Sequence, residues 1–184
     1  MRFDLKILII RHAKVNHVWK KWCTSSEFDE QCSMYDTASV DTSPLNPVTC
    51  DVSDIYISKL IRTYYTARKV FGDKKFTRTS LINEVPMCAG IKTSLKMPLW
   101  FWYMVARIQW ITGSSRQPET MDKTRRRARI FVKKILDRNI SCAVVTHGFF
   151  MRTLIKALKE QGFTSDVNPL YFHNGEVITL YRNE

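Results

Sequence analysis

Two continuous apolar runs, at residues 5–10 and 141–146, are the clearest features of the hydrophobic pattern. In the first run Lys6 is the only polar residue, and the second run is centred on Ala143, Val144 and Val145. Uninterrupted runs rich in β-branched residues are typical of strands at the centre of a parallel sheet that is covered on both faces. We therefore expect both segments to be central strands.

The rest of the chain alternates between short strand patterns and longer helical patterns. Further strands are predicted at residues 55–57 and 79–82. Helices are predicted at about residues 59–71, 98–113, 118–137 and 149–161. This alternation predicts an α/β protein, a three-layer α/β/α sandwich with a mainly parallel central sheet.

Two segments do not fit the simple alternation. Near the C-terminus, Asn174-Gly175 stands between residues 170–173 and 176–180, which is a type I′ hairpin signal. Residues 14–50 show little periodicity and are long for a plain loop, which favours an insertion or a lid with a short helix. With 184 residues and no linker or repeat, we expect a single domain over residues 1–184.

Composition narrows the cellular setting and the class of ligand. The formal net charge of +12 predicts attraction to anions, whether phosphorylated metabolites, nucleic acid or acidic lipid. No apolar stretch has the form of a signal peptide or the length of a membrane span, because Arg11 and Arg107 interrupt the candidates. Five cysteines without CxxC pairing indicate reduced thiols, so we expect a cytoplasmic protein.

Candidate chemistry lies at the ends of the two central strands. Arg11-His12 follows the first strand, and His147-Gly148 follows the second. In open α/β sheets the reactive crevice lies beyond the carboxyl ends of the strands, so the two pairs point to one cationic site. Taken singly, a surface Arg with an incidental His, and a core His bonded to backbone, would also explain them.

Two further residues occupy similar positions. Arg62 lies in the first turn of the helix predicted after the strand at residues 55–57, where unpaired N–H groups and a guanidinium fork suit phosphate oxygens. Glu84 follows the short segment at residues 79–82 and would suit a proton donor to a leaving alcohol. The plainer alternatives are a solvated helix Arg and a surface ion pair.

The ordered set of motifs resembles the histidine phosphatase superfamily, specifically the shorter branch 1 of this phosphoglycerate-mutase-like fold. The Arg-His-Gly signature of the family appears as residues 11–13, with Ala13 in place of Gly. Its Ser-x-Leu-x-Arg-Ala-x-x-Thr-Ala segment appears as residues 58–67, with Thr63 in place of Ala. Its Leu-x-Glu-x-x-x-Gly segment corresponds to residues 81–90, and its late His-Gly to His147-Gly148.

This resemblance implies a role for each candidate residue. His12 would be the nucleophile that takes the phosphoryl group, and Glu84 would protonate the leaving group. Arg11, Arg62 and His147 would hold the phosphate oxygens without a metal or cofactor, and nearby positive charge would keep His12 unprotonated. Asn16 follows the signature closely enough to touch substrate.

Other conspicuous residues have structural explanations. The aromatic segment at residues 99–110 suits helix packing, although a substrate mouth or a self-association face, and thus a dimer, stays open. The basic run at residues 123–129 suits a solvated helix face, with nucleic-acid contact as a minority reading. His17 and His173 suit a solvated and a structural position. The Cys-x5-Arg, phosphate-loop, GxGxxG and HExxH motifs are absent from the sequence.

These observations predict a metal-independent phosphomonoesterase that works through a phosphohistidine. Its substrate would be a small phosphorylated metabolite or a phosphoprotein, with no membrane partner. Within enzymes the alternative is a phosphoglycerate-mutase-type phosphotransferase, for which the chain is short. Outside enzymes it is a phospho-ligand or nucleic-acid binding module on the same fold.

Overall fold

A five-stranded sheet forms the centre of the computed structural model, which describes residues 5–49, 52–165 and 171–182. The strand order is β6-β5-β8-β1-β9. The four parallel strands are β6 (Thr77–Arg78), β5 (Asp54–Ile57), β8 (Cys142–Thr146) and β1 (Leu5–Arg11). β9 (Val177–Arg182) joins the edge beside β1 in antiparallel direction. The predicted α/β class and mainly parallel sheet are confirmed.

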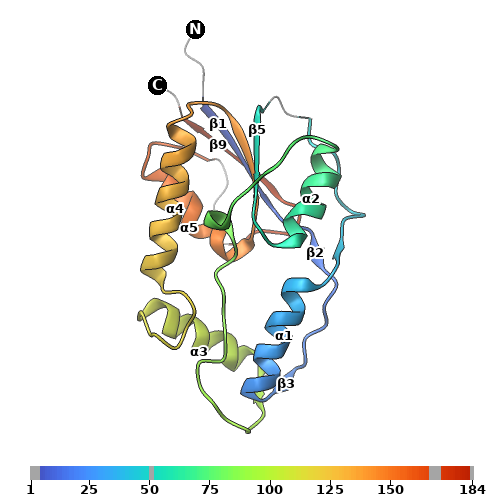
Figure 1. Ribbon diagram of the computed structural model, residues 1–184, viewed down its shortest axis with the longest axis vertical. Helices are drawn as coiled ribbons and strands as arrows, with labels where there is room; N and C mark the ends of the chain where they lie inside the picture. The colour runs from blue at the N-terminus through green and yellow to red at the C-terminus, as the bar shows by residue number, and fades with distance from the viewer. Residues whose placement is uncertain (1–4, 50–51, 166–170, 183–184) are drawn as a thin grey trace.

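Helices cover both faces of this sheet (Figure 1). α4 (Met121–Leu136) and α5 (Gly148–Lys159) lie on one face, and α2 (Ile61–Phe71) lies on the other. Successive side chains of a strand point to opposite faces, so Ile7 and Ile9 pack towards α4 and α5 while Leu8 and Ile10 pack towards α2. Burial on both sides explains why β1 reads as a continuous apolar run.

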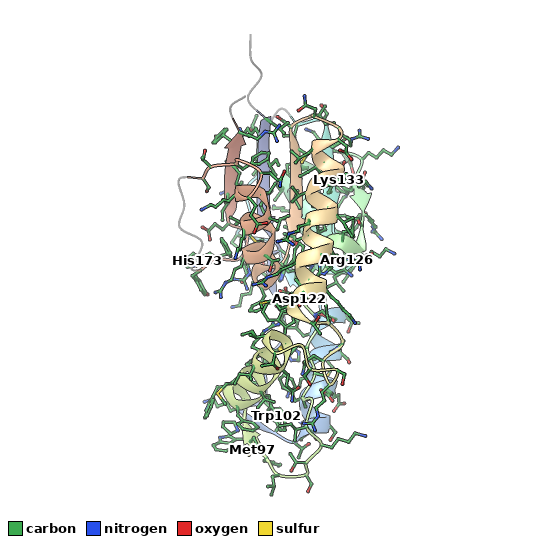
Figure 2. All side chains as sticks on the ribbon, turned by 90° about the vertical axis from the view of Figure 1, so that its left-hand side faces the viewer. Met97, Trp102, Asp122, Arg126, Lys133 and His173 are labelled. Carbon is green, nitrogen blue, oxygen red and sulfur yellow. The ribbon has the colours of Figure 1, made fainter. Side chains whose placement is uncertain are left out.

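A second group of elements extends beyond the carboxyl ends of the parallel strands. It contains α1 (Ser25–Thr37), α3 (Leu99–Ile111) and a two-stranded pair of β3 (Trp22–Cys23) with β7 (Met97–Pro98). Figure 2 shows Met97 and Trp102 at this end of the molecule. Trp102 is fully buried beside Phe28, and its indole N–H donates to the carbonyl of Cys23 at 3.0 Å. The aromatic segment therefore supplies a small core of its own.

The segment at residues 14–50 is more regular than its sequence suggests. A capping box begins α1, in which Thr24 accepts from the N–H of Glu27 and Glu27 accepts from the N–H of Thr24. Before and after the helix, β2 (Lys14–Val15) pairs with β4 (Val40–Asp41). A role as a lid stays a prediction.

Two predicted elements are wrong. Instead of a strand at residues 79–82, a 3₁₀ helix forms at Ser80–Ile82, because the Thr79 hydroxyl accepts from the N–H of Leu81 and turns the chain. Instead of a hairpin at residues 170–180, β9 pairs with β1 and residues 171–173 are not in a strand, while residue 170 lies outside the described ranges. Gly175 alone has the positive φ expected of the turn.

Two predictions about the setting can be compared with the described residues. Cys23, Cys32, Cys88 and Cys142 are free thiols, and Cys50 lies outside the described ranges. Among the helices described, none is long and apolar enough to cross a bilayer.

Candidate active site

The register of two parallel strands places the two candidate histidines side by side. Arg11 at the end of β1 is paired with Thr146 at the end of β8. His12 and His147 follow directly, and the N–H of His12 donates to the carbonyl of Thr146 at 2.9 Å. The centroids of the two imidazole rings are 5.0 Å apart. Residues separated by 135 positions in the sequence thus form one site.

The hydrogen bonding of His12 defines its tautomer. Nδ1 lies 2.7 Å from the carbonyl oxygen of Ala13, which can only accept, so Nδ1 carries the proton. Nε2 therefore has the lone pair. Burial and then the Arg62 guanidinium lower the pKa of His12 to about 3, against the opposing effect of the Ala13 hydrogen bond. The side chain is neutral at physiological pH and has the electronic form of a nucleophile.

His147 is fully buried and held at both ring nitrogens. Its Nδ1 accepts from Arg62 Nε at 3.1 Å, and its Nε2 therefore donates to the Ser58 hydroxyl at 2.8 Å. Burial lowers its pKa well below the usual value, and the nearby His12 and Arg62 lower it further. Both nitrogens have protein partners, so in this arrangement His147 orients Arg62.

Arg62 links the histidines to the surface. It lies in the first turn of α2 and is almost fully buried, with Nη1 2.9 Å from Asp36 Oδ1 and the guanidinium over the ring of Tyr35. One turn later, the Thr66 hydroxyl donates to the carbonyl of Arg62 and accepts from the N–H of Ala13 at 2.9 Å. The helix that positions Arg62 thus also holds the loop after His12.

Arg11 lies at the same sheet edge, with a different set of contacts. Its Nη1 donates to the carbonyl of Phe172, and its Nε is buried without a hydrogen-bond partner among the described residues. A Cβ atom on Gly148 would come within 2.8 Å of that Nε. Glycine after His147 is therefore needed for the guanidinium to pack against the start of α5.

Glu84 is positioned by the N-terminus of α5. Its carboxylate accepts from the backbone N–H groups of Phe149 and Phe150, at 3.3 and 3.0 Å, and from its own neighbour Val85 at 2.9 Å. A helix N-terminus offers unpaired N–H groups and a positive dipole end, which bind a carboxylate well. The sequence suggested that Glu84 follows a strand or forms a surface ion pair, and neither is the case in the part of the chain that the structure describes. Glu84 instead caps the helix that follows His147.

The side chains of Asn16 and His17 contact residues other than His12 and His147. Asn16 is exposed and its amide donates to the Ser39 hydroxyl at 3.1 Å. His17 packs edge-on against Trp19 and Tyr35, and its Nε2 is buried with no hydrogen-bond partner in the described part of the chain. The structure therefore groups His12, Arg62 and His147 closely, and leaves Asn16 outside that group.

A cavity of about 890 Å³ opens beside this group. Arg62 and Glu84 line it, together with residues from α1, from α3 and from the segment after the 3₁₀ helix. Arg62 connects the cavity wall to the histidines, because its Nε contacts His147, while His12 and His147 are not among the lining residues. Among the described residues, no cluster of three or more His, Cys, Asp or Glu side chains is arranged to hold a metal ion.

A family model of the histidine phosphatase superfamily, branch 1, matches residues 45–184. The chain belongs to the histidine phosphatase superfamily. A search of curated protein sequences gives no significant match. The match confirms the family that the motifs predicted, branch 1 of this superfamily.

Solved structures with similar folds support the fold assignment at low sequence identity. Mycobacterial hydrolase 2 aligns with a TM-score of 0.61 at 16% identity, covering 98% of this chain and 83% of that one. A mycobacterial glucosyl-3-phosphoglycerate phosphatase gives 0.59 at 14%, covering 97% and 91%. A phosphoserine phosphatase mutant from Entamoeba histolytica gives 0.55 at 15%, covering 95% and 89%.

Two residues of this histidine phosphatase site were missed in the sequence. Asp36 lies in the weakly patterned segment at residues 14–50, and no spacing relates it to Arg62. Asn174 read as a turn residue, but its amide donates to the carbonyl of His12 at 2.9 Å and so fixes the backbone at the candidate nucleophile. Only the structure shows that the C-terminal segment returns to β1.

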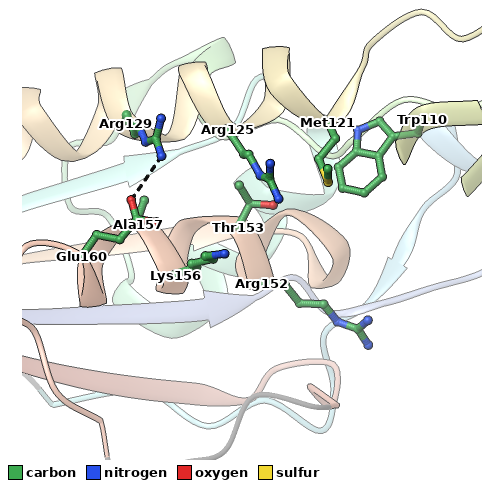
Figure 3. Close-up of a pocket in the computed structure, with 9 residues that line it drawn as sticks. All are labelled: Trp110, Met121, Arg125, Arg129, Arg152, Thr153, Lys156, Ala157 and Glu160. Atoms are coloured by element: carbon green, nitrogen blue, oxygen red, sulfur yellow. Dashed lines mark ion pairs between the residues drawn. The ribbon is translucent and has the colours of Figure 1, made fainter. Parts of the chain in front are cut away.

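A second hollow lies away from the imidazoles. Figure 3 shows a groove between α4 and α5, about 310 Å³ in volume, with basic side chains from both helices. Arg129 and Glu160 form an ion pair across it at 3.5 Å. Arg126 is exposed on α4, while Ala128 and Ile135 are buried. Arg127, however, is largely buried and paired with Glu119, so the expected solvated basic face is only partly present.

The low pKa of His12 predicts a specific loss of stability in acid. The folded-state pKa is about 3 and the unfolded value is near 6.5, so the unfolded chain binds more protons between these limits. The contribution of neutral His12 to the free energy of unfolding should be complete above pH 6.5. Below that pH the free energy of unfolding should fall by up to about 1.4 kcal/mol per pH unit because of this group. Urea titrations from pH 4 to 7 should show a shallower slope for His12→Gln than for wild type. An equally shallow slope in the exposed His173→Gln control would contradict this assignment.

Asp36 should compete with bound oxyanions for Arg62. Its side chain is 52% exposed, so the ion pair contributes at most about 1 kcal/mol and is easily exchanged for another anion. We expect Asp36→Asn to tighten orthovanadate binding roughly two- to fivefold, measured by calorimetry. Asp29→Asn, on the same helix and cavity wall but bonded to the N–H of Ala89, is the matched control. Weaker binding in Asp36→Asn, or equal effects in both variants, would contradict the competition.

Proposed function

We propose that this protein is a metal-independent phosphomonoesterase that forms a phosphohistidine on His12. The observation that carries the proposal is the neutral imidazole of His12, which has its proton on Nδ1 and its lone pair on Nε2. Its ring centroid lies 5.0 Å from that of His147, the hydrogen-bond partner of Arg62. Phosphoryl transfer needs an aligned nucleophile and positive charge around the equatorial oxygens. Arg62, with Arg11 at the same sheet edge, would supply that charge.

The proposed reaction has two steps. His12 Nε2 attacks phosphorus, the ester P–O bond breaks, and the leaving alkoxide takes a proton from Glu84. Water then attacks the phosphohistidine and gives its proton to Glu84, so that inorganic phosphate leaves and neutral His12 is restored. Covalent catalysis divides one difficult displacement into two easier ones.

Glu84 is well placed for this exchange and needs a proton before the first step. Its carboxylate is fixed at the start of α5, next to His147, and lines the cavity that would hold the leaving group. The carboxyl group can alternate between accepting backbone N–H bonds when ionised and donating to the ester oxygen when protonated. These contacts support a role for Glu84 as general acid and base.

Named relatives of the same fold support hydrolysis over transfer. They include the phosphoserine phosphatase from Entamoeba histolytica and the mycobacterial glucosyl-3-phosphoglycerate phosphatase. Another is described as a putative alpha-ribazole-5′-phosphate phosphatase from Escherichia coli. A small phosphorylated metabolite would fit the cavity of about 890 Å³, and a phosphoprotein could present a phosphorylated side chain to it.

Loss of the nucleophile gives the direct test. His12→Ala should lower kcat for 4-nitrophenyl phosphate by more than about a thousandfold, with chelator present throughout. Wild type that is quenched in base after brief reaction with labelled substrate should retain acid-labile phosphate, and His12→Ala should not. The exposed His173→Ala variant is the control and should keep full activity. Substantial turnover by His12→Ala would rule out the covalent step.

A leaving-group series tests the role of Glu84. If Glu84 donates the proton, Glu84→Gln should slow alkyl phosphates by about a hundredfold or more and slow activated aryl phosphates only slightly. A residue that only caps α5 would lower kcat/KM for both classes equally, through displacement of the site. Circular dichroism of the variant checks that α5 stays folded.

A further inference from the structure

The charges that line the large cavity are almost completely paired. Each of its four carboxylates already accepts hydrogen bonds or forms an ion pair. The partners are the Ala89 N–H for Asp29, Arg62 for Asp36, the α5 N-terminus for Glu84 and Arg127 for Glu119. Any cation left without such a partner therefore stands out.

Arg107 is that cation. It lies on α3 and lines the cavity, and within the described ranges its guanidinium makes no hydrogen bond and no ion pair. Its guanidinium carbon lies 3.5 Å from the centroid of the Phe149 ring. Stacking of this kind fixes the plane of the guanidinium and leaves its N–H edge available for a ligand.

Arg127, in the same cavity, shows what a structural arginine looks like here. It binds both oxygens of Glu119, at 2.7 and 3.2 Å, and donates to the carbonyls of Leu81 and Asn83. The N–H groups of Arg127 are occupied by hydrogen bonds within the protein, whereas those of Arg107 have no hydrogen-bond partner among the described residues. Arg127 therefore has a structural role, and Arg107 has donors available for a ligand.

Glu84 does not neutralise Arg107. It is a nearby acid that acts against the lowering of the Arg107 pKa by burial, but no ion pair joins the two within 4.0 Å. The Glu84 carboxylate is turned towards the N–H groups of Phe149 and Phe150. When Glu84 holds the proton that the reaction requires, it carries no charge to offset Arg107 at all.

We propose that Arg107 is a specificity residue that binds a carboxylate carried by the leaving alcohol of the substrate. This inference rests on the proposed phosphatase function. A single uncompensated guanidinium matches a single negative charge, and its planar fork matches the two oxygens of a carboxylate. Trp19, Tyr103 and Met87 line the same cavity, which suits a flat or apolar body between the phosphate and the carboxylate.

Two esters that differ in one charge test this specificity. The substrates are 4-carboxyphenyl phosphate and 4-carbamoylphenyl phosphate, compared as a ratio of kcat/KM. Arg107→Gln should lower that ratio roughly tenfold relative to wild type and leave the carbamoyl ester within about threefold. Comparison between variants cancels the difference in leaving-group reactivity. Arg107→Lys should retain part of the preference, because it keeps the charge and loses the fork.

Arg152→Gln is the matched control. Arg152 also lies beside Phe149, with its guanidinium carbon 5.9 Å from the ring centroid, but it lines the groove shown in Figure 3 and is not among the residues that line the cavity. The Arg152→Gln substitution also removes one positive charge beside Phe149, but it does not change the lining of the cavity. An equal fall of the ratio in Arg152→Gln, or an unchanged ratio in Arg107→Gln, would overturn the proposal.

A binding measurement separates this inference from the catalytic one. In the His12→Ala protein, calorimetry should show tighter binding of the carboxyphenyl ester than of the carbamoyl ester, and Arg107→Gln should abolish the difference. This comparison decides the role of Arg107 even if neither ester is hydrolysed by wild type. Equal affinities in the His12→Ala protein, or no binding of either ester, would overturn the proposal whether or not Arg107→Gln folds.

Discussion

The hydrogen bond from Arg62 to His147 joins the two halves of the sheet edge into one site. It requires an unprotonated Nδ1 on His147, which burial and the surrounding positive charge maintain. A second donor of Arg62, Nη1, lies 2.9 Å from Asp36 Oδ1, and the side chain lines the cavity. A protonated His147 would have no lone pair for Arg62, and a buried cation would then face another. The neutral state of one histidine thus sets the direction of the guanidinium.

The central strands and the main helices could be predicted because their signals are local. Residues 5–10 are apolar at every position but Lys6, as burial of both sheet faces demands, and α4 and α5 carry clear helical periodicity. The prediction of a strand at residues 79–82 was wrong because a short apolar stretch fits a strand and a 3₁₀ turn equally well. There the Thr79 side chain decided the outcome, by bonding to the backbone two residues on.

Only those residues of the candidate site that follow a strand or belong to a sequence motif could be predicted. His12, His147 and Arg62 all follow strands, and the rule for open α/β sheets places them together. The contacts of Asp36 and Asn174 depend on how α1 and the C-terminal segment fold back, and no local pattern encodes that path. Glu84 was found, but its bonds to α5 depend on packing between distant segments.

The pairing of β1 with both β8 and β9 joins the first strand of the chain to its last quarter. The proposed nucleophile, His12, follows the first strand directly, yet the groups that hold its backbone, Thr146 and Asn174, come from the last quarter of the chain. Contacts so distant in sequence form slowly, since the long intervening loop must be closed before they contribute. During synthesis the emerging N-terminal half therefore lacks the partners that hold His12, and the arrangement described here is complete only when the C-terminal segment has joined the sheet.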